Sequence, residues 1–154
     1  MIVMATPKNQ EKFFKTVSII LMGIDLVLST YLYFSYDTAK GGYQFMEMIP
    51  WIRAMGIDYH LGVDGISLPM IWLTSIIIFC GCFASWTVKV RAKEFYALLL
   101  ILTAGVFGVF ASLNLFFFFL FYELAVLPMY LLIGIWGTGK KEYAAMKLTL
   151  YLLL

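Results

Sequence analysis

The sequence predicts an all-α, polytopic transmembrane helix bundle, with four complete helices, the start of a fifth helix and a short strand-like loop outside the membrane. Of the 154 residues, 63% are hydrophobic and only 13% are charged, and the mean hydropathy is +0.92. Soluble domains are about half apolar and about a quarter charged. A chain of this length has too little interior to hide so much apolar surface from water, so a lipid bilayer is its expected solvent.

Four segments are close to the length of about 20 apolar residues that a helix needs to cross a bilayer. They are 16–36, 67–88, 95–111 and 115–136. The first is interrupted by Asp25 and the fourth holds a single charge at Glu123, whereas the other two carry no charge. Residues 1–15 then form an arm before the first span.

Short breaks separate these segments. Residues 112–114 (Ser-Leu-Asn) form the turn between the third and fourth spans. Residues 137–139 (Gly-Thr-Gly) end the fourth span, because glycine suits a left-handed helix cap. A fifth helix begins near Tyr143 and is cut off at Leu154, which gives a truncated helix at 143–154.

Small residues predict where neighbouring helices approach closely. They are Ala104, Gly108 and Ala111 in the third span, and Gly81 and Ser85 in the second. At this spacing the residues share one side of a helix, so each set is expected to form a packing face.

The distribution of basic residues predicts the orientation, because cytoplasmic loops carry an excess of lysine and arginine. Eight bases fall on one side: Lys8, Lys12 and Lys15 in the arm, Lys89, Arg91 and Lys93 after the second span, and Lys140 and Lys141 after the fourth. Only Lys40 and Arg53 fall in the loop 37–66. We therefore expect a cytoplasmic N-terminus, a cytoplasmic arm at 1–15 and an outer loop at 37–66.

The outer loop contains a pattern of period two. Apolar Ile57, Tyr59, Leu61 and Val63 alternate with Asp58, His60, Gly62 and Asp64. Such alternation predicts a short strand, which we expect to lie on the membrane surface. The single histidine, His60, is expected to be a solvated or hydrogen-bonded surface residue, and a pH sensor or a ligand is the alternative.

The remaining composition argues against several classes of protein. The net charge is +2 and the basic residues form no stripe, which argues against binding to nucleic acid. Cys80 and Cys82 lie inside an apolar run and give no disulfide framework and no spacing for zinc or an iron–sulfur cluster. We expect no metal site and no cofactor-binding motif in this chain.

Glu123 is the strongest candidate for a functional residue. It is the one charge in a long apolar segment, and a charge near the middle of the bilayer costs about 2.5–3.5 kcal/mol or more. Such residues usually face the interior of a bundle, take a partner and mark a path for ions or protons. We expect Glu123 to load and release a proton, and a permanently neutral glutamic acid that joins two helices is the alternative.

Three other residues have two interpretations each. Pro128 removes the helical donor of the Leu124 carbonyl, which predicts either a wet kink beside Glu123 or a plain packing kink. Lys147 is a candidate relay amine or partner of Glu123, or else it extends to the membrane interface. Asp25 falls near the middle of the first span and is either functional or tolerated in a less strictly apolar helix.

One long run resembles a known family. Residues 117–137, FFFLFYELAVLPMYLLIGIWG, resemble the M subunit (chain 4) of NADH:quinone oxidoreductase, respiratory complex I, a member of the antiporter-like proton-translocating family. Residues 50–52 (PWI), 59–68 (YHLGVDGISL) and 144–147 (AAMK) fit the same family. The likeness covers most of the chain from Pro50 on, and its glutamate-to-proline part is specific.

The resemblance implies a membrane-arm subunit that translocates protons. The family glutamate that Glu123 matches belongs to a buried chain of charged residues and pairs with a lysine on a later helix. Electron transfer in other subunits drives the proton movement, so the flavin, the iron–sulfur clusters and the quinone site belong to those partners and none is expected here. The implied partners are other membrane subunits of the complex, including neighbouring antiporter-like subunits.

The resemblance also implies a location and an extent. The location is a bacterial inner membrane or an equivalent energy-transducing membrane. Family members have many more helices, so residues 1–154 are expected to be the N-terminal part of a single antiporter-like membrane domain, or one piece of a split subunit. Two alternatives remain: a subunit of a multi-subunit sodium/proton antiporter or membrane-bound hydrogenase, and a structural piece that does not pump.

Overall fold

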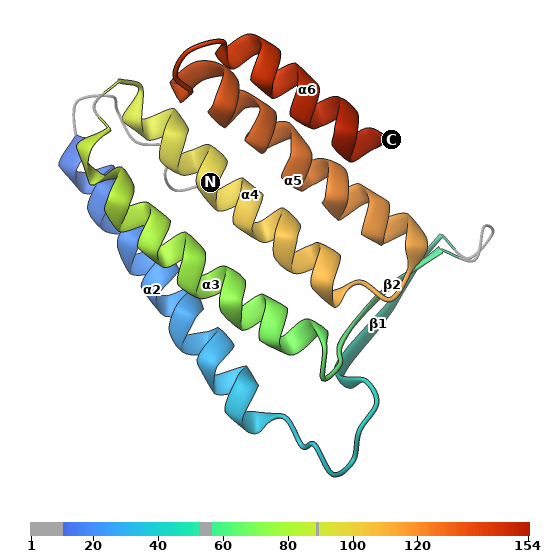
Figure 1. Cartoon of the computed structure of the whole chain (residues 1–154). Coiled ribbons are helices and arrows are strands. Elements are labelled where there is room, and N and C mark those ends of the chain that lie inside the picture. The colour runs from blue at the N-terminus through green and yellow to red at the C-terminus, as the bar shows by residue number, and fades with distance from the viewer. Residues whose placement is uncertain (1–10, 53–56, 89) are drawn as a thin grey trace.

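Five α-helices lie side by side in the part of the chain that the computed structural model describes, residues 11–52, 57–88 and 90–154 (Figure 1). They are α2 (Glu11–Ser35), α3 (Ser67–Ala84), α4 (Ala92–Ala111), α5 (Leu115–Trp136) and α6 (Lys141–Leu153), and a short 3-10 turn, η2 (Ser85–Thr87), extends α3. Four of these helices, α2 to α5, are long and apolar enough to cross a membrane. The predicted all-α membrane bundle with four spans is therefore confirmed.

The helix bounds differ from the predicted ones mainly where charged residues join a helix end. Helix α5 has the predicted bounds, but α2 already includes residues 11–15 of the expected arm, and α4 and α6 begin earlier than expected. In α4 the first turn is stabilised by an ion pair between Arg91 and Glu94. Residues 1–10 of the arm, Arg53 and Lys89 lie outside the described residues.

Each helix packs against the next one along the chain, and α2 also packs against α4. In Figure 1, α2 and α6 lie at opposite edges of the array. The closest approach joins α4 to α5, where a Cβ added to Gly105 would lie 2.7 Å from the backbone nitrogen of Ala125. The expected packing faces are therefore partly wrong: Gly105 and Gly108 are buried, whereas Ala104 is exposed and a Cβ added to Gly81 would meet nothing within 4 Å.

The two ends of α5 are set by different caps. At its start, the Asn114 side chain accepts a hydrogen bond from the Phe116 N–H at 2.9 Å, as expected of an asparagine N-cap. At its end, Gly137 is extended, with φ −61° and ψ 160°, and donates its N–H to the Ile133 carbonyl. The left-handed glycine is Gly139, with φ +70°, so the predicted left-handed conformation lies two residues beyond the cap.

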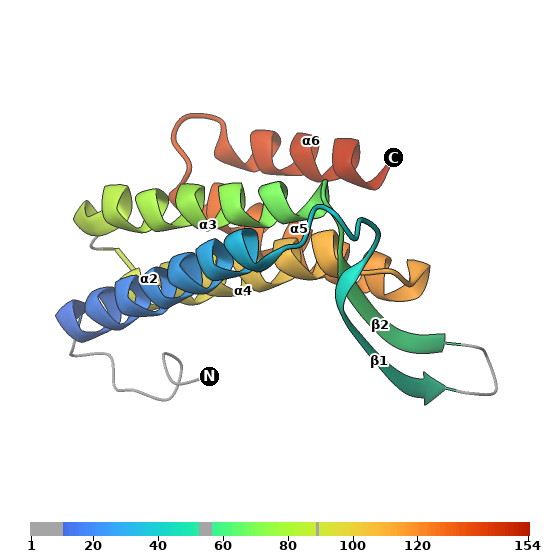
Figure 2. The same cartoon turned by 90° about the horizontal axis from the view of Figure 1, so that it is seen from below.

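A β-hairpin lies at one end of the bundle (Figure 2). Its strands, β1 (Gln44–Ile52) and β2 (Ile57–Val63), pair in antiparallel register, with Met48 opposite His60. Strand β2 confirms the predicted strand, whereas β1 was not predicted. The hairpin is joined to the turn before α5, because the Leu113 N–H donates to the His60 carbonyl at 2.9 Å.

Asp64 connects the hairpin to α3. Its carboxyl accepts the N–H groups of Ser67, at 2.6 Å, and of Ile66, at 3.1 Å. The Asp64 N–H in turn donates to the Ser67 hydroxyl at 3.0 Å. The backbone N–H of Ser67 is the main cause that holds the pKa of Asp64 below its ordinary value, and the Ser67 side chain and then the Ile66 N–H add to it.

Asp64→Ala is expected to lower the free energy of unfolding by about 1 kcal/mol, because it removes the acceptor of the Ile66 and Ser67 N–H groups at the start of α3. Because the folded pKa is depressed, the contribution of Asp64 to the free energy of unfolding is fully present above its unfolded pKa, which is near 4. This contribution is lost as the pH falls through the lower pKa of the folded state. Thermal unfolding of the full-length protein at neutral and at acidic pH measures both effects. Asp58→Ala, which removes a hairpin carboxyl without a hydrogen bond among the described residues, should leave the midpoint unchanged.

Candidate functional site

Glu123 lies within three residues of the centre of α5, on a face that the other described helices leave open. Its neighbours one turn away on either side, Phe119 and Leu127, are also exposed, at 57% and 61%. Glu123 forms no hydrogen bond and no ion pair with the residues that the structure describes. Within this chain, the expectation that Glu123 faces the bundle interior is therefore wrong.

The other sides of α5 are covered by its neighbours. Helix α4 meets α5 at Ala125 and at the ring of Phe121, which face Gly105 and Gly108. Helix α6 meets α5 at Tyr122, whose hydroxyl donates to the Leu152 carbonyl. The contacts with α4 and α6 therefore set the rotation of α5. In that rotation Glu123, which follows Tyr122 directly, is left uncovered.

Pro128 lies one turn beyond this position and is buried. Because proline has no N–H, the carbonyl of Leu124 lacks its α-helical donor. Helix α5 nevertheless continues through Pro128 to Trp136. The carbonyl of Leu124, the residue that follows Glu123, can therefore accept a hydrogen bond from a donor outside α5.

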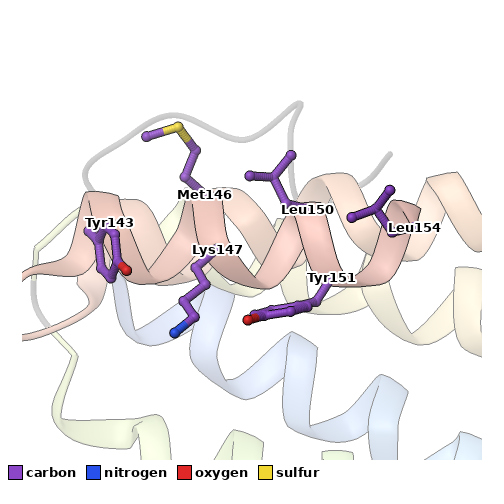
Figure 3. A pocket seen from close by; sticks show the side chains of 6 residues that line it. All are labelled: Tyr143, Met146, Lys147, Leu150, Tyr151 and Leu154. Atoms are coloured by element: carbon purple, nitrogen blue, oxygen red, sulfur yellow. The ribbon is translucent and has the colours of Figure 1, made fainter.

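Lys147 lies in the middle of α6 and is exposed. Its amine lies 5.9 Å from the centre of the Tyr143 ring and 5.7 Å from that of the Tyr151 ring, both within the range of a cation–π contact. Figure 3 shows this amine between the two rings on one side of the helix. The groove here is lined by Tyr143, Met146, Lys147, Leu150, Tyr151 and Leu154. The two aromatic rings contact the cation, and among the described residues no carboxylate pairs with it.

The structure does not pair Glu123 with Lys147. The ion pairs among the described residues are Lys40–Asp37 and Arg91–Glu94. Since Tyr122 meets Leu152, Glu123 lies near the level of the last turn of α6, and Lys147 lies five residues earlier. At 1.5 Å per residue, this is an axial offset of about 7.5 Å. The two groups lie on adjacent helices, and a direct bond would need one of them to move.

The end of the bundle opposite the hairpin gathers bases and aromatic rings. Lys15 is buried, and its amine donates to the Trp86 carbonyl at 2.7 Å. Lys93 lies over the Phe14 ring, 5.5 Å from its centre. Lys15 therefore packs between helices instead of lying in the expected arm, and its place after Phe14 in an apolar stretch is the signal that sequence reasoning did not use.

The two cysteines and His60 were the other residues considered as possible ligands. Cys80 is exposed and Cys82 buried, and both are free thiols. His60 is half-buried in β2, where its carbonyl accepts the bond from Leu113. No group of three histidine, cysteine, aspartate or glutamate side chains that could hold a metal ion occurs among the described residues.

Comparison with known proteins gives two kinds of match. A family model described as NADH:quinone oxidoreductase/Mrp antiporter, TM, matches residues 112–154, the part that contains α5 and α6. The chain is 36% identical over 146 residues to NAD(P)H-quinone oxidoreductase chain 4 2 of Thermosynechococcus vestitus. It is 38% identical over 145 residues to the chloroplastic chain 4 of Chara vulgaris, and 38% identical over 149 residues to chain 4 of Gloeobacter violaceus.

These alignments cover the two partners unequally. They include 94%, 94% and 96% of this chain, but only 27%, 29% and 28% of the three relatives. The chain thus spans a little more than a quarter of the length of the relatives it matches. Both Glu123 and Lys147 lie in the segment matched by the family model.

Proposed function

The chain is a relative of chain 4 of the NAD(P)H-quinone oxidoreductases, and on this premise we propose that it serves as a proton-translocating part of the membrane arm of such a complex. The proposal rests on the position of Glu123. This ionisable side chain lies near the centre of α5, and its neighbours on the helix surface are exposed apolar residues. A carboxylate in contact with lipid tails would cost about 2.5–3.5 kcal/mol or more. Other protein of the complex therefore covers this face.

Such a covered carboxyl is suited to moving protons. Burial favours the neutral acid, and an approaching cation favours the carboxylate. A small displacement of a partner amine can therefore load or release the proton. Because Pro128 lacks an N–H, the Leu124 carbonyl can bind water or a polar group next to the Glu123 carboxyl.

Lys147 is proposed as a relay amine of the same path. Its amine lies between Tyr143 and Tyr151, and its backbone lies about 7.5 Å along the helix axis from the level of Glu123. Ordered water molecules or intervening side chains would have to connect the two groups. In this arrangement Lys147 takes no part in a permanent ion pair and remains available to a mobile partner.

The redox chemistry belongs to other subunits in this proposal. Flavin, iron–sulfur clusters and quinone lie on partners, and the chain contributes proton transfer and packing. The partners include other membrane subunits, among them neighbouring antiporter-like ones. The membrane is the bacterial inner membrane or an equivalent energy-transducing membrane.

The orientation is proposed from the bases at the two ends of the bundle. Arg91, Lys140 and Lys141 lie at the end opposite the hairpin, so that end faces the cytoplasm together with the N-terminus. The hairpin and the rest of 37–66 then lie outside.

This orientation predicts the result of a labelling experiment. In a background without Cys80 and Cys82, a cysteine placed by Lys40→Cys should react with a membrane-impermeant maleimide from the outside only. The matched variant Lys140→Cys should react from the cytoplasmic side only. Labelling of position 40 from the cytoplasmic side alone would overturn the topology.

A second candidate function is that of a subunit in a multi-subunit sodium/proton antiporter, since the description of the matching family includes Mrp antiporters. The names of the relatives, all quinone oxidoreductase chains, favour the first candidate. Proton uptake by membrane vesicles tests the choice. Uptake that depends on NAD(P)H oxidation and is lost on substitution of Glu123 supports the first, whereas uptake driven only by a sodium gradient supports the second.

A further inference from the structure

A second carboxyl lies at the centre of the membrane, in a helix that the Glu123 path does not use. The span in α2 runs from Phe13 to Ser35, so Asp25 is one residue from its middle. Helix α2 packs against α3 and α4, whereas α5 packs against α4 and α6. Any role of Asp25 is therefore separate from the exposed face of α5.

The Asp25 carboxyl faces Ser75 on α3. Ser75 is 1% exposed and lies two residues from the middle of the span Ser67–Thr87. Its hydroxyl is within hydrogen-bonding reach of the carboxyl and also donates to the Ile71 carbonyl at 3.1 Å. The second carboxyl oxygen, Oδ2, is buried and has no hydrogen-bond partner among the described residues.

These contacts favour the neutral acid. A carboxylate buried at this depth needs several hydrogen-bond donors. Among the described residues, the Ser75 hydroxyl is the one within reach. A hydroxyl has a single proton. While Ser75 donates to Ile71, its oxygen can only accept from Asp25, and a carboxyl can donate only when it is protonated.

No cation on the neighbouring helices holds the charged form. Helix α3 has no charged residue, and the charges of α4 lie in its first turn. The other titratable residues that these helices carry in or near the spans are Lys15, Tyr31 and Tyr33 on α2, Cys80 and Cys82 on α3, and Lys93, Glu94 and Tyr96 on α4. Lys15 is ten residues from Asp25, about 15 Å along α2, and donates to Trp86.

Loss of the proton is nevertheless possible, because Ser75 can serve either form. When the O–H bond of the acid breaks, the electron pair stays on the carboxylate and the proton passes to a water molecule. The Ser75 hydroxyl then turns from Ile71 to the carboxylate, and the Ile71 carbonyl keeps its helical donor, the Ser75 N–H. The buried oxygen of Ser18, two turns earlier on the same face of α2, also has no partner among the described residues and would bind such water.

We propose that Asp25 and Ser75 form a second proton-binding site between α2 and α3. In this site Asp25 holds an exchangeable proton. Ser75 accepts a hydrogen bond from the acid and donates one to the carboxylate. The site requires only that α2 and α3 span a membrane, so it stands or falls independently of the Glu123 path.

Infrared pH-difference spectroscopy of the purified complex with the full-length subunit tests this site. The C=O stretch of a protonated carboxyl should be present at neutral pH, shift in D₂O and disappear as the pH is raised. Asp25→Asn should remove this band. Ser75→Ala should shift its frequency and move its disappearance to higher pH, because the carboxylate then loses the hydrogen bond that the Ser75 hydroxyl donates.

Ser29→Ala is the matched control. Ser29 is also buried on α2, but its hydroxyl donates to the Leu26 carbonyl, so the band and its midpoint should not change. If Asp25→Asn does not assemble, isotopic labelling of aspartate side-chain carboxyls identifies the band in the unaltered chain and in Ser75→Ala. The site is refuted if no aspartate band responds to Ser75→Ala, or if the band responds neither to pH nor to D₂O.

Discussion

Gly105→Leu is expected to force α4 and α5 apart and to lower the free energy of unfolding by about 2 kcal/mol or more. A Cβ at this position would lie 2.7 Å from the backbone nitrogen of Ala125 and 3.0 Å from its Cα. A helix backbone cannot turn aside as a flexible side chain can, so the two helices must separate. The thermal midpoint of the full-length protein in detergent measures the effect.

Gly108 and Gly81 provide the comparison. A Cβ on Gly108 would lie 2.2 Å from ring atoms of Phe121, so Gly108→Ala should also lower the midpoint, although the ring can shift in part. Gly81→Ala makes the same chemical change in α3, where nothing lies within 4 Å. It should leave the midpoint unchanged or raise it, because alanine favours a helix more than glycine does. An unaltered midpoint in Gly105→Leu would contradict the close approach of α4 and α5.

Glu123→Gln is expected to reduce proton uptake by about 100-fold or to abolish it, because a positioned proton-transfer group contributes about that much and an amide cannot take its place. Glu123→Asp should be milder, since the carboxyl remains but is one methylene further from its partners. The initial rate of proton uptake by vesicles that contain the assembled complex measures both.

Glu142→Gln is the matched control for this substitution. It makes the same chemical change in the first turn of α6, near Lys140 and Lys141 at the end of the bundle, and outside the four candidate spans. Proton uptake should remain near the wild-type rate. Normal uptake by an assembled Glu123→Ala complex would contradict the role given to Glu123.

The spans could be predicted because they depend on local chemistry. Helix α5 has a clear N-cap at Asn114 and an apolar run to Trp136 in which Glu123 is the one charge, so its bounds follow from the sequence alone. Strand β1 could not be predicted in the same way. Its residues do not alternate, Pro50 interrupts the pattern, and its partner strand lies several residues further along the chain.

The orientation of side chains around a helix was harder to predict. Helix α5 is apolar on all sides, so the sequence has no polar stripe to indicate which side faces α4. The position of Glu123 near the middle of α5 was therefore predictable, but its place on the uncovered face was not. Likewise Gly105, and not Ala104, meets the partner helix, because the rotation of α4 is set by packing against Ala125.

We propose that this chain couples proton movement to quinone reduction through Glu123. The most direct test is the ratio of protons taken up to electrons transferred, measured in the same vesicles for the wild-type complex and for Glu123→Gln. We predict that electron transfer from NAD(P)H to quinone continues in the variant when the proton gradient is dissipated, and that the ratio falls. An assembled Glu123→Gln complex with the wild-type ratio would contradict the claim and would leave the chain a structural role.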